Sequence, residues 1–227
     1  MSRRTARRPL LVVTFLALGV TAWAAAAIVI EDWSTQGLGA RGILSGWKGQ
    51  NWGRPAHDFA IVEHDGHRVL HLKSRNESST ISKDIRGQVT LKATPVLEWQ
   101  WKAVVLPAGG DSRKRATDDQ AAQIFVVWPR TPEAVRSRII GYVWDTTAPV
   151  DTIAKSEKTG TVTYVVVRSG TAALGQWITE HRNVVDDYRR IFAEEPDDPG
   201  AVAISIDSND TRSTAESFLG RILFRTP

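Results

Sequence analysis

Residues 96–105 (VLEWQWKAVV), 118–128 (DDQAAQIFVVW) and 139–144 (IIGYVW) decide the fold of this 227-residue chain. The first segment alternates apolar and polar residues with a period of two, which is typical of a strand with one buried face. The second segment is almost continuously apolar, which indicates a central or doubly covered strand. The three segments carry four of the nine tryptophans. They therefore predict three strands that lie together at the centre of a sheet.

The rest of the chain continues this pattern of short strands separated by turn residues. Further strand candidates are 58–63, 68–73, 78–83, 162–168, 201–207 and 218–224. Only the segment 183–193 has helical spacing, with Asn183 as an N-cap. The sequence predicts an all-β fold: a two-layer antiparallel β-sandwich (jelly-roll, galactose-binding-like or concanavalin-like) with one short helix near 183–193.

The N-terminal segment 1–27 differs from the rest of the chain. It has four arginines before Pro9, an apolar run over 10–20, and the small-x-small sequence Ala22-Trp23-Ala24. These features predict a secretory signal peptide, with an uncleaved N-terminal anchor as the alternative. Residues 28–227 then form a single β-sandwich domain, and we expect a periplasmic or secreted protein.

The charge balance excludes some partners once the leader is set aside. Of the 29 basic residues, four arginines lie in the leader, which leaves 25 against 25 acidic residues. A domain without net charge gives no electrostatic reason to bind nucleic acid, and contact with a membrane is expected only through an uncleaved leader. The chain has no cysteine, so neither disulfides nor a thiolate site contribute.

Several sequence blocks, taken in order, resemble one bacterial family over roughly residues 31–225. The blocks are Asp118-Asp119-x-Ala121-Ala122, Tyr142-Val143-Trp144, Val165 to Gly170, the group Trp177, Glu180, Arg182, Asp187-Tyr188 and Phe192, and finally Asp207-x-Asn209-Asp210-Thr211 with Ala215 and Gly220. In this order they resemble the domain of unknown function family 3047 (DUF3047). The resemblance implies an exported bacterial domain without an assigned activity, and it transfers no catalytic residue.

Two acidic loops are candidate ligand sites. Asp118-Asp119 precede a central strand, and Asp207, Asn209 and Asp210 follow another. Carboxylate and amide oxygens on loops suit calcium, for which Asp118, Asp119 and Asp207 would be the ligands, and they also suit sugar hydroxyls. The alternative is that these residues end strands by hydrogen bonding to their own backbone.

Arg168 and the tryptophans complete the candidate site. Arg168 ends an apolar strand, where it either pairs with one of the acids Asp118, Asp119 or Asp207 or binds a ligand. Exposed tryptophans can stack on the apolar faces of sugar rings, and the candidates beside glycines or at a strand end are Trp47, Trp52 and Trp144. Most tryptophans are nevertheless expected to fill the core.

Three functions remain open from the sequence. The favoured one is a non-catalytic exported β-sandwich that binds carbohydrate or a cell-envelope glycan, with calcium as an optional cofactor. The second is a glycan-active hydrolase or lyase that uses the loop carboxylates, although no nucleophile motif is present and no catalytic residue is assigned. The third is a purely structural or interaction module of the envelope.

Overall fold

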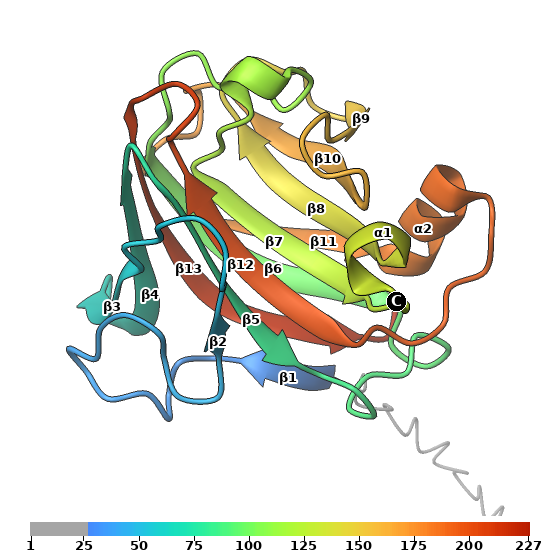
Figure 1. Ribbon diagram of the computed structural model, residues 1–227. Helices are drawn as coiled ribbons and strands as arrows, with labels where there is room; N and C mark the ends of the chain where they lie inside the picture. The colour runs from blue at the N-terminus through green and yellow to red at the C-terminus, as the bar shows by residue number, and fades with distance from the viewer. Residues whose placement is uncertain (1–26) are drawn as a thin grey trace, which may run out of the picture.

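The computed structural model describes residues 27–227, which form two stacked β-sheets (Figure 1). In sheet A the strand order is β11-β6-β13-β4-β3, and β1 also pairs with β13. Its strands are β1 (Ala27–Glu31), β3 (Asp58–His64), β4 (His67–Arg75), β6 (Val96–Val105), β11 (Ile178–Asn183) and β13 (Thr214–Arg225). The predicted β-sandwich is confirmed.

Sheet B lies in front of sheet A in the view of Figure 1. Its strand order is β2-β5-β12-β7-β8-β10-β9. Its strands are β2 (Lys48–Gly49), β5 (Ser78–Asp84), β7 (Ala122–Trp128), β8 (Arg138–Asp145), β9 (Ile153–Lys155), β10 (Val162–Ser169) and β12 (Ala201–Asp207). Three short helices complete the described part of the chain: η1 (Arg115–Thr117), α1 (Glu133–Arg136) and α2 (Val184–Phe192).

The three segments that decide the fold are strands, but they do not share one sheet. β6 belongs to sheet A, whereas β7 and β8 are neighbours in sheet B. Their aromatic rings meet between the sheets: Trp99 lies 5.4 Å from Tyr142, and Trp101 lies 5.9 Å from Trp144, between ring centroids. The prediction of one central sheet was wrong because the apolar pattern of a strand shows that a face is buried but not against what, and the face of β6 is buried against sheet B rather than beside β7 and β8 in one layer.

One strand pair departs from the predicted antiparallel arrangement. β10 runs parallel to β8, while β9 pairs with β10 in the antiparallel sense. A parallel pair needs a crossover connection, and the segment 146–161, which carries β9, provides it. This crossover covers one edge of sheet B.

The predicted helix 183–193 is confirmed as α2. Asn183 caps it, because its Oδ1 accepts hydrogen bonds from the backbone N–H groups of Val185 and Asp186 at 3.1 and 3.3 Å. Tyr188 is fully buried, with its ring 4.7 Å from that of Trp128. The helix therefore closes one end of the space between the sheets.

The predicted signal peptide and its cleavage positions lie outside the described residues, except for Ala27, which begins β1. Within 27–227 no helix combines the length and the apolar character needed to cross a membrane.

Candidate functional site

The outer face of sheet B is the surface of this sheet that points away from sheet A. Side chains alternate along each strand, and residues such as Ile124, Ile204 and Tyr142 belong to the core between the sheets. Their neighbours along the strands therefore point outward. A second, separate apolar cluster lies on this outer face, formed by Val143, Ala148, Val162, Tyr164 and Val166, with Phe125 and Ile139 packed against it.

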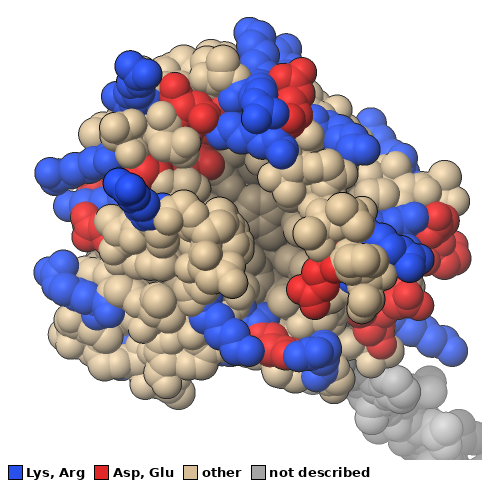
Figure 2. Space-filling view, viewed as in Figure 1, with Lys and Arg blue, Asp and Glu red and all other residues tan. Residues whose placement is uncertain are grey.

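The strand register arranges the outer side chains in rows across the sheet. The central row is Ser82, Ala203, Phe125, Gly141 and Tyr164. The row beside it is Thr80, Ser205, Gln123, Val143 and Val166. Both rows run from polar or small residues on β5 and β12 to apolar residues on β8 and β10. Figure 2 shows a hollow over the middle of this face, with an uncharged floor and with charged residues around its rim. We call this hollow and the two rows the outer groove.

Two aromatic rings meet over a glycine in the outer groove. The rings of Phe125 and Tyr164 lie 6.4 Å apart between centroids, on strands that flank Gly141. A Cβ atom at Gly141 would lie 2.6 Å from Cε1 of Phe125 and 3.1 Å from Cδ1 of Tyr164. Only glycine leaves room for both rings to lie against the sheet, where they form an aromatic floor. Phe125 is the partly exposed ring of this floor, whereas Tyr164 is 8% exposed and supports Phe125 from the side.

Polar groups border the aromatic floor on one side. Thr80 Oγ1 donates to Ser205 Oγ at 2.9 Å, and Ser205 Oγ donates to the carbonyl oxygen of Ser79. Gln123 Nε2 donates to Gln120 and to Asp207. The Oε1 atom of Gln123 accepts no hydrogen bond from any residue in the described part of the chain, although it is not among the buried polar atoms that lack a partner. Gln123 is 3% exposed, so this free acceptor atom lies at the edge of the solvent-accessible surface.

Asp118 and Asp207 close one end of the outer groove. Asp118 Oδ2 accepts hydrogen bonds from Tyr164 Oη at 3.3 Å and Ser156 Oγ at 3.4 Å. Asp207 Oδ1 accepts from the Gln120 backbone N–H at 2.7 Å. Burial raises the pKa of Asp118, and burial together with the negative charge of Asp119 raises the pKa of Asp207 well above its ordinary value.

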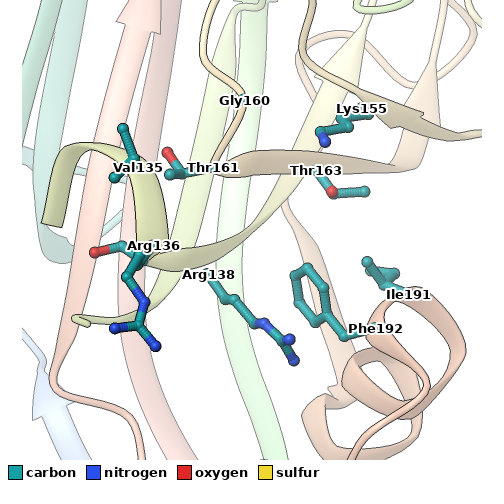
Figure 3. A pocket seen from close by; sticks show the side chains of 10 residues that line it. Val135, Arg136, Arg138, Lys155, Gly160, Thr161, Thr163, Ile191 and Phe192 are labelled. Carbon is teal, nitrogen blue, oxygen red and sulfur yellow. The ribbon is translucent and has the colours of Figure 1, made fainter. Parts of the chain in front are cut away.

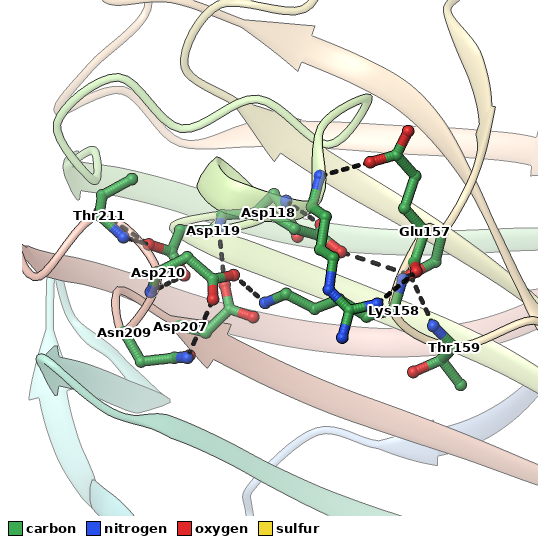
Figure 4. Close-up of polar contacts among 12 residues, drawn as sticks. Asp118, Asp119, Glu157, Lys158, Thr159, Asp207, Asn209, Asp210 and Thr211 are labelled. Carbon is green, nitrogen blue, oxygen red and sulfur yellow. Dashed lines mark hydrogen bonds and ion pairs between the residues drawn. The ribbon is translucent and has the colours of Figure 1, made fainter.

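Asp119 joins the two acidic loops (Figure 4). Its carboxylate accepts hydrogen bonds from the backbone N–H groups of Asp210 at 3.1 Å and Thr211 at 2.6 Å, and from Thr211 Oγ1 at 2.7 Å. Asp210 also forms an ion pair with Lys158. Asn209 is exposed and contacts only its neighbour Asp210, at 3.3 Å. The structure thus brings the two predicted loops together, and the hydrogen bonds between them mainly stabilise one loop against the other.

The expected calcium site is not formed. The carboxylates of Asp118, Asp119 and Asp207 face N–H and O–H donors, as described above. Across residues 27–227, no three or more His, Cys, Asp or Glu side chains are grouped so that they could hold a metal ion. Asp119 and Asp207 accept hydrogen bonds from loop backbone N–H groups, which is the alternative that the sequence offered. Asp118 instead accepts from the side chains of Gln120, Tyr164 and Ser156.

Arg168 does not join the acids. Its guanidinium pairs with Glu180 on β11, with 2.5 Å between Nε and Oε1. The expectation of a partner among Asp118, Asp119 and Asp207 was wrong, because Arg168 lies beyond a register shift at the end of β10 and reaches across to sheet A.

Trp144 is not a stacking platform, because only 1% of it is exposed and its Nε1 donates to the Gly170 carbonyl oxygen. Trp47 is also buried, stacked 5.8 Å from Trp33. Of the three candidate tryptophans, only Trp52, at 61% exposed, presents a large surface to solvent. Trp47 and Trp144 thus fill the core, which is the role that the sequence favoured for most of the tryptophans.

The aromatic floor was missed at the sequence level. Phe125 sits in a run of apolar residues, so its outward direction was not visible, and Tyr164 sits in a similar run. Gly141 was the available signal, because a glycine inside a strand often marks a site where neighbouring groups approach the backbone closely.

Solved structures similar to this chain include carbohydrate-binding modules. A family 11 carbohydrate-binding module of a cellulosomal cellulase of Clostridium thermocellum has a TM-score of 0.45 at 8% identity, with 90% of this chain and 97% of that chain covered. The CBM22-1 xylan-binding domain from Paenibacillus barcinonensis has a TM-score of 0.41 at 13% identity, covering 91% and 97%. At these values the likeness gives no basis for transferring a ligand.

Two comparisons at the sequence level complete the picture. A search of the curated proteins returned no match. A family model described as "Protein of unknown function (DUF3047)" matches residues 45–223, which include both acidic loops and the whole outer groove. Because this match spans well over half of the 227 residues, the chain belongs to the DUF3047 family.

Proposed function

We propose that this protein binds a glycan chain in the outer groove, and that it does so after export from the cytoplasm. The observation that carries the proposal is the partly exposed ring of Phe125, which packs against the buried ring of Tyr164 and lies beside the polar groups of Gln123, Ser205 and Thr80. Sugar rings have apolar faces that pack on aromatic rings, and hydroxyls that need acceptors and donors at the edge.

The charge of the groove suggests which glycan it suits. The floor is uncharged in Figure 2, and desolvation raises the pKa values of the two acids at its end, the buried Asp118 and the partly buried Asp207. A floor without cations offers nothing to the carboxylates or sulfates of an acidic polysaccharide. We therefore favour a neutral stretch of glycan as the ligand of the outer groove.

Titration of the purified protein with neutral oligosaccharides, followed by calorimetry, tests this function. Phe125→Ala removes half of the aromatic floor and should raise the Kd by roughly tenfold or more, as expected for an aromatic anchor. Leu38→Ala is the matched control, because Leu38 is 59% exposed but lies away from sheet B, beside β3. Melting temperatures establish that both variants remain folded.

Two results would count against the outer groove. Unchanged binding by Phe125→Ala would show that the glycan binds elsewhere. Loss of binding in Trp52→Ala alone would place the site at the single large exposed aromatic of residues 27–227.

Export is the second half of the proposal. Its support is the basic, then apolar, then small-residue order of residues 1–27. Expression of the full chain with a C-terminal tag, followed by cell fractionation and mass determination, tests it. We expect tagged protein outside the cytoplasm with a new N-terminus between residues 25 and 28. Tagged full-length protein in the cytoplasm would refute export.

A further inference from the structure

A second pocket opens away from the outer groove, between α1, α2 and the ends of β8, β9 and β10 (Figure 3). Its volume is about 360 Å³. It is lined by Val135, Arg136, Ser137, Arg138, Lys155, Gly160, Thr161, Thr163, Ile191 and Phe192. Three of these side chains are cationic and none is acidic, in contrast to the uncharged floor of the outer groove.

One of the three cations is already neutralised. Arg138 forms two hydrogen bonds of 2.6 Å with the carboxylate of Glu194, which lowers the pKa of Glu194 and keeps it ionised. The Arg138 guanidinium also lies 4.8 Å from the ring centroid of Phe192. Arg138 is therefore part of the wall of the pocket and holds α2 against β8.

The other two cations have no acidic partner. Neither Arg136 nor Lys155 has a carboxylate within ion-pair distance in the part of the chain that the structure describes. Arg136 Nη1 donates only to the carbonyl oxygen of Thr131, at 3.2 Å. Both side chains are exposed, and they reach the pocket from α1 on one side and β9 on the other. In Figure 3 the Arg136 guanidinium points away from Lys155, toward its acceptor on Thr131, so the exposed Arg136 side chain has to turn into the pocket to place an anion between the two charges.

A buried hydroxyl points to the same kind of ligand. Thr163 is only 7% exposed, yet its hydroxyl makes no hydrogen bond to another residue of the described chain. It is not among the fully enclosed polar atoms without a partner, so the pocket is the space from which a ligand can reach it. A buried hydroxyl without a partner is uncommon, and an oxygen-bearing ligand would supply one.

We propose that this pocket binds an organic anion. Its carboxylate or phosphate oxygens accept charge-assisted hydrogen bonds from Arg136 and Lys155, and a hydrogen bond from the Thr163 hydroxyl. The apolar part of the ligand packs against Val135 and Ile191. This site is separate from the outer groove, so it does not depend on the proposed glycan-binding function.

The test compares three matched probes: glucose, glucuronate and glucose 6-phosphate. They share a sugar ring but carry no charge, a carboxylate and a phosphate, respectively. Binding to the purified full chain is followed by calorimetry at low and raised salt. We expect one or both anions to bind, and glucose to bind at least tenfold more weakly. Raised salt should lower the affinity for the anion, because it screens the charges. The preferred anion identifies whether a carboxylate or a phosphate is the natural group.

The double variant Arg136→Gln/Lys155→Gln removes both free charges while keeping a polar side chain at each position. It should weaken binding of the anion at least tenfold and leave the melting temperature unchanged, because neither side chain makes an ion pair in the described chain. Arg41→Gln/Lys92→Gln is the matched control, since both residues are exposed, lie away from the pocket and likewise have no carboxylate partner among residues 27–227.

Three outcomes would overturn the proposal. They are equal binding of glucose and the anions, anion binding that survives the double variant, and absence of binding by both anions. The outer groove is tested independently, because Phe125→Ala should leave the anion affinity unchanged and Arg136→Gln/Lys155→Gln should leave neutral glycan binding unchanged.

Discussion

At the scale of single residues, the acids at the end of the outer groove show how one residue pattern can indicate either a ligand site or a structural loop. Asp, Asn and Thr on loops suit a metal or a sugar, and they equally suit loop backbone. What decides between them is which donors lie within reach, and Asp119 finds the backbone of Asp210 and Thr211. These donors are far away in sequence, so residue identity could indicate an important position without revealing its partner.

Asp207 should make the stability of the protein depend on pH in an unusual direction. Its folded pKa lies above that of the unfolded chain, because burial and the charge of Asp119 disfavour the ionised form. The folded state therefore holds a proton that the unfolded state has released, and its stability falls as pH rises from about 4 through the folded pKa. Asp207→Asn mimics the neutral acid, so its stability relative to the unmodified protein should increase from about pH 4 to about pH 8.

Urea unfolding at both pH values measures this difference. The control is Asp84→Asn, because hydrogen bonding to Arg86 lowers the pKa of Asp84 to about 2. Asp84 contributes stability that is already present above the unfolded pKa and is lost only as pH falls below about 4, so the difference between Asp84→Asn and the unmodified protein should stay nearly constant from about pH 4 to about pH 8. A constant difference between Asp207→Asn and the unmodified protein at all pH values would contradict the raised pKa.

At the scale of secondary-structure elements, the sequence predicted helix α2, but it did not predict the contacts that attach the helix to the two sheets. The apolar spacing, the Asn183 cap and the acidic first turn are all local signals. The anchor is not local: Asp187 accepts hydrogen bonds from Arg182 on β11 and from Tyr142 on β8. A buried network of this kind joins one helix to both sheets, and only the folded chain brings its members together.

Asp187→Ala should destabilise the protein by about 3 kcal/mol. Asp187 is 5% exposed, and its removal leaves the Arg182 guanidinium and the Tyr142 hydroxyl without their partner. Asp186→Ala is the control on the same helix turn: the Asp186 side chain is 65% exposed, so its loss should cost less than about 0.5 kcal/mol. Chemical denaturation measures both values, and equal costs would show that the network does not hold the helix.

At the scale of the whole molecule, the sequence predicted the class of fold better than the arrangement of its layers. Period-two patterns in 96–105 and 139–144 identified strands, because alternation follows directly from strand geometry. Which sheet each strand joins depends on pairing between distant segments, such as β6 with β11 and β13. The same limit hid the candidate site, since Phe125 and Tyr164 become neighbours only through the register of three strands.

The tryptophans between the sheets provide a final prediction, because they differ in how well their N–H groups are satisfied. Trp99 and Trp144 are both buried and both pack across the interface between sheets A and B. Trp144 Nε1 donates to Gly170, whereas Trp99 Nε1 has no acceptor among the described residues. Replacement by phenylalanine removes similar volume at each site, but only at position 99 does it also remove an unsatisfied donor.

We therefore expect Trp99→Phe to change the free energy of unfolding by less than about 1 kcal/mol, because relief of the buried N–H offsets the loss of packing. Trp144→Phe should cost about 2 to 3 kcal/mol, because lost packing and a lost hydrogen bond add. Thermal and urea unfolding of the two variants measure the contrast. A larger cost at position 99 would mean that contact area between the sheets dominates over hydrogen-bond satisfaction in holding the sandwich together.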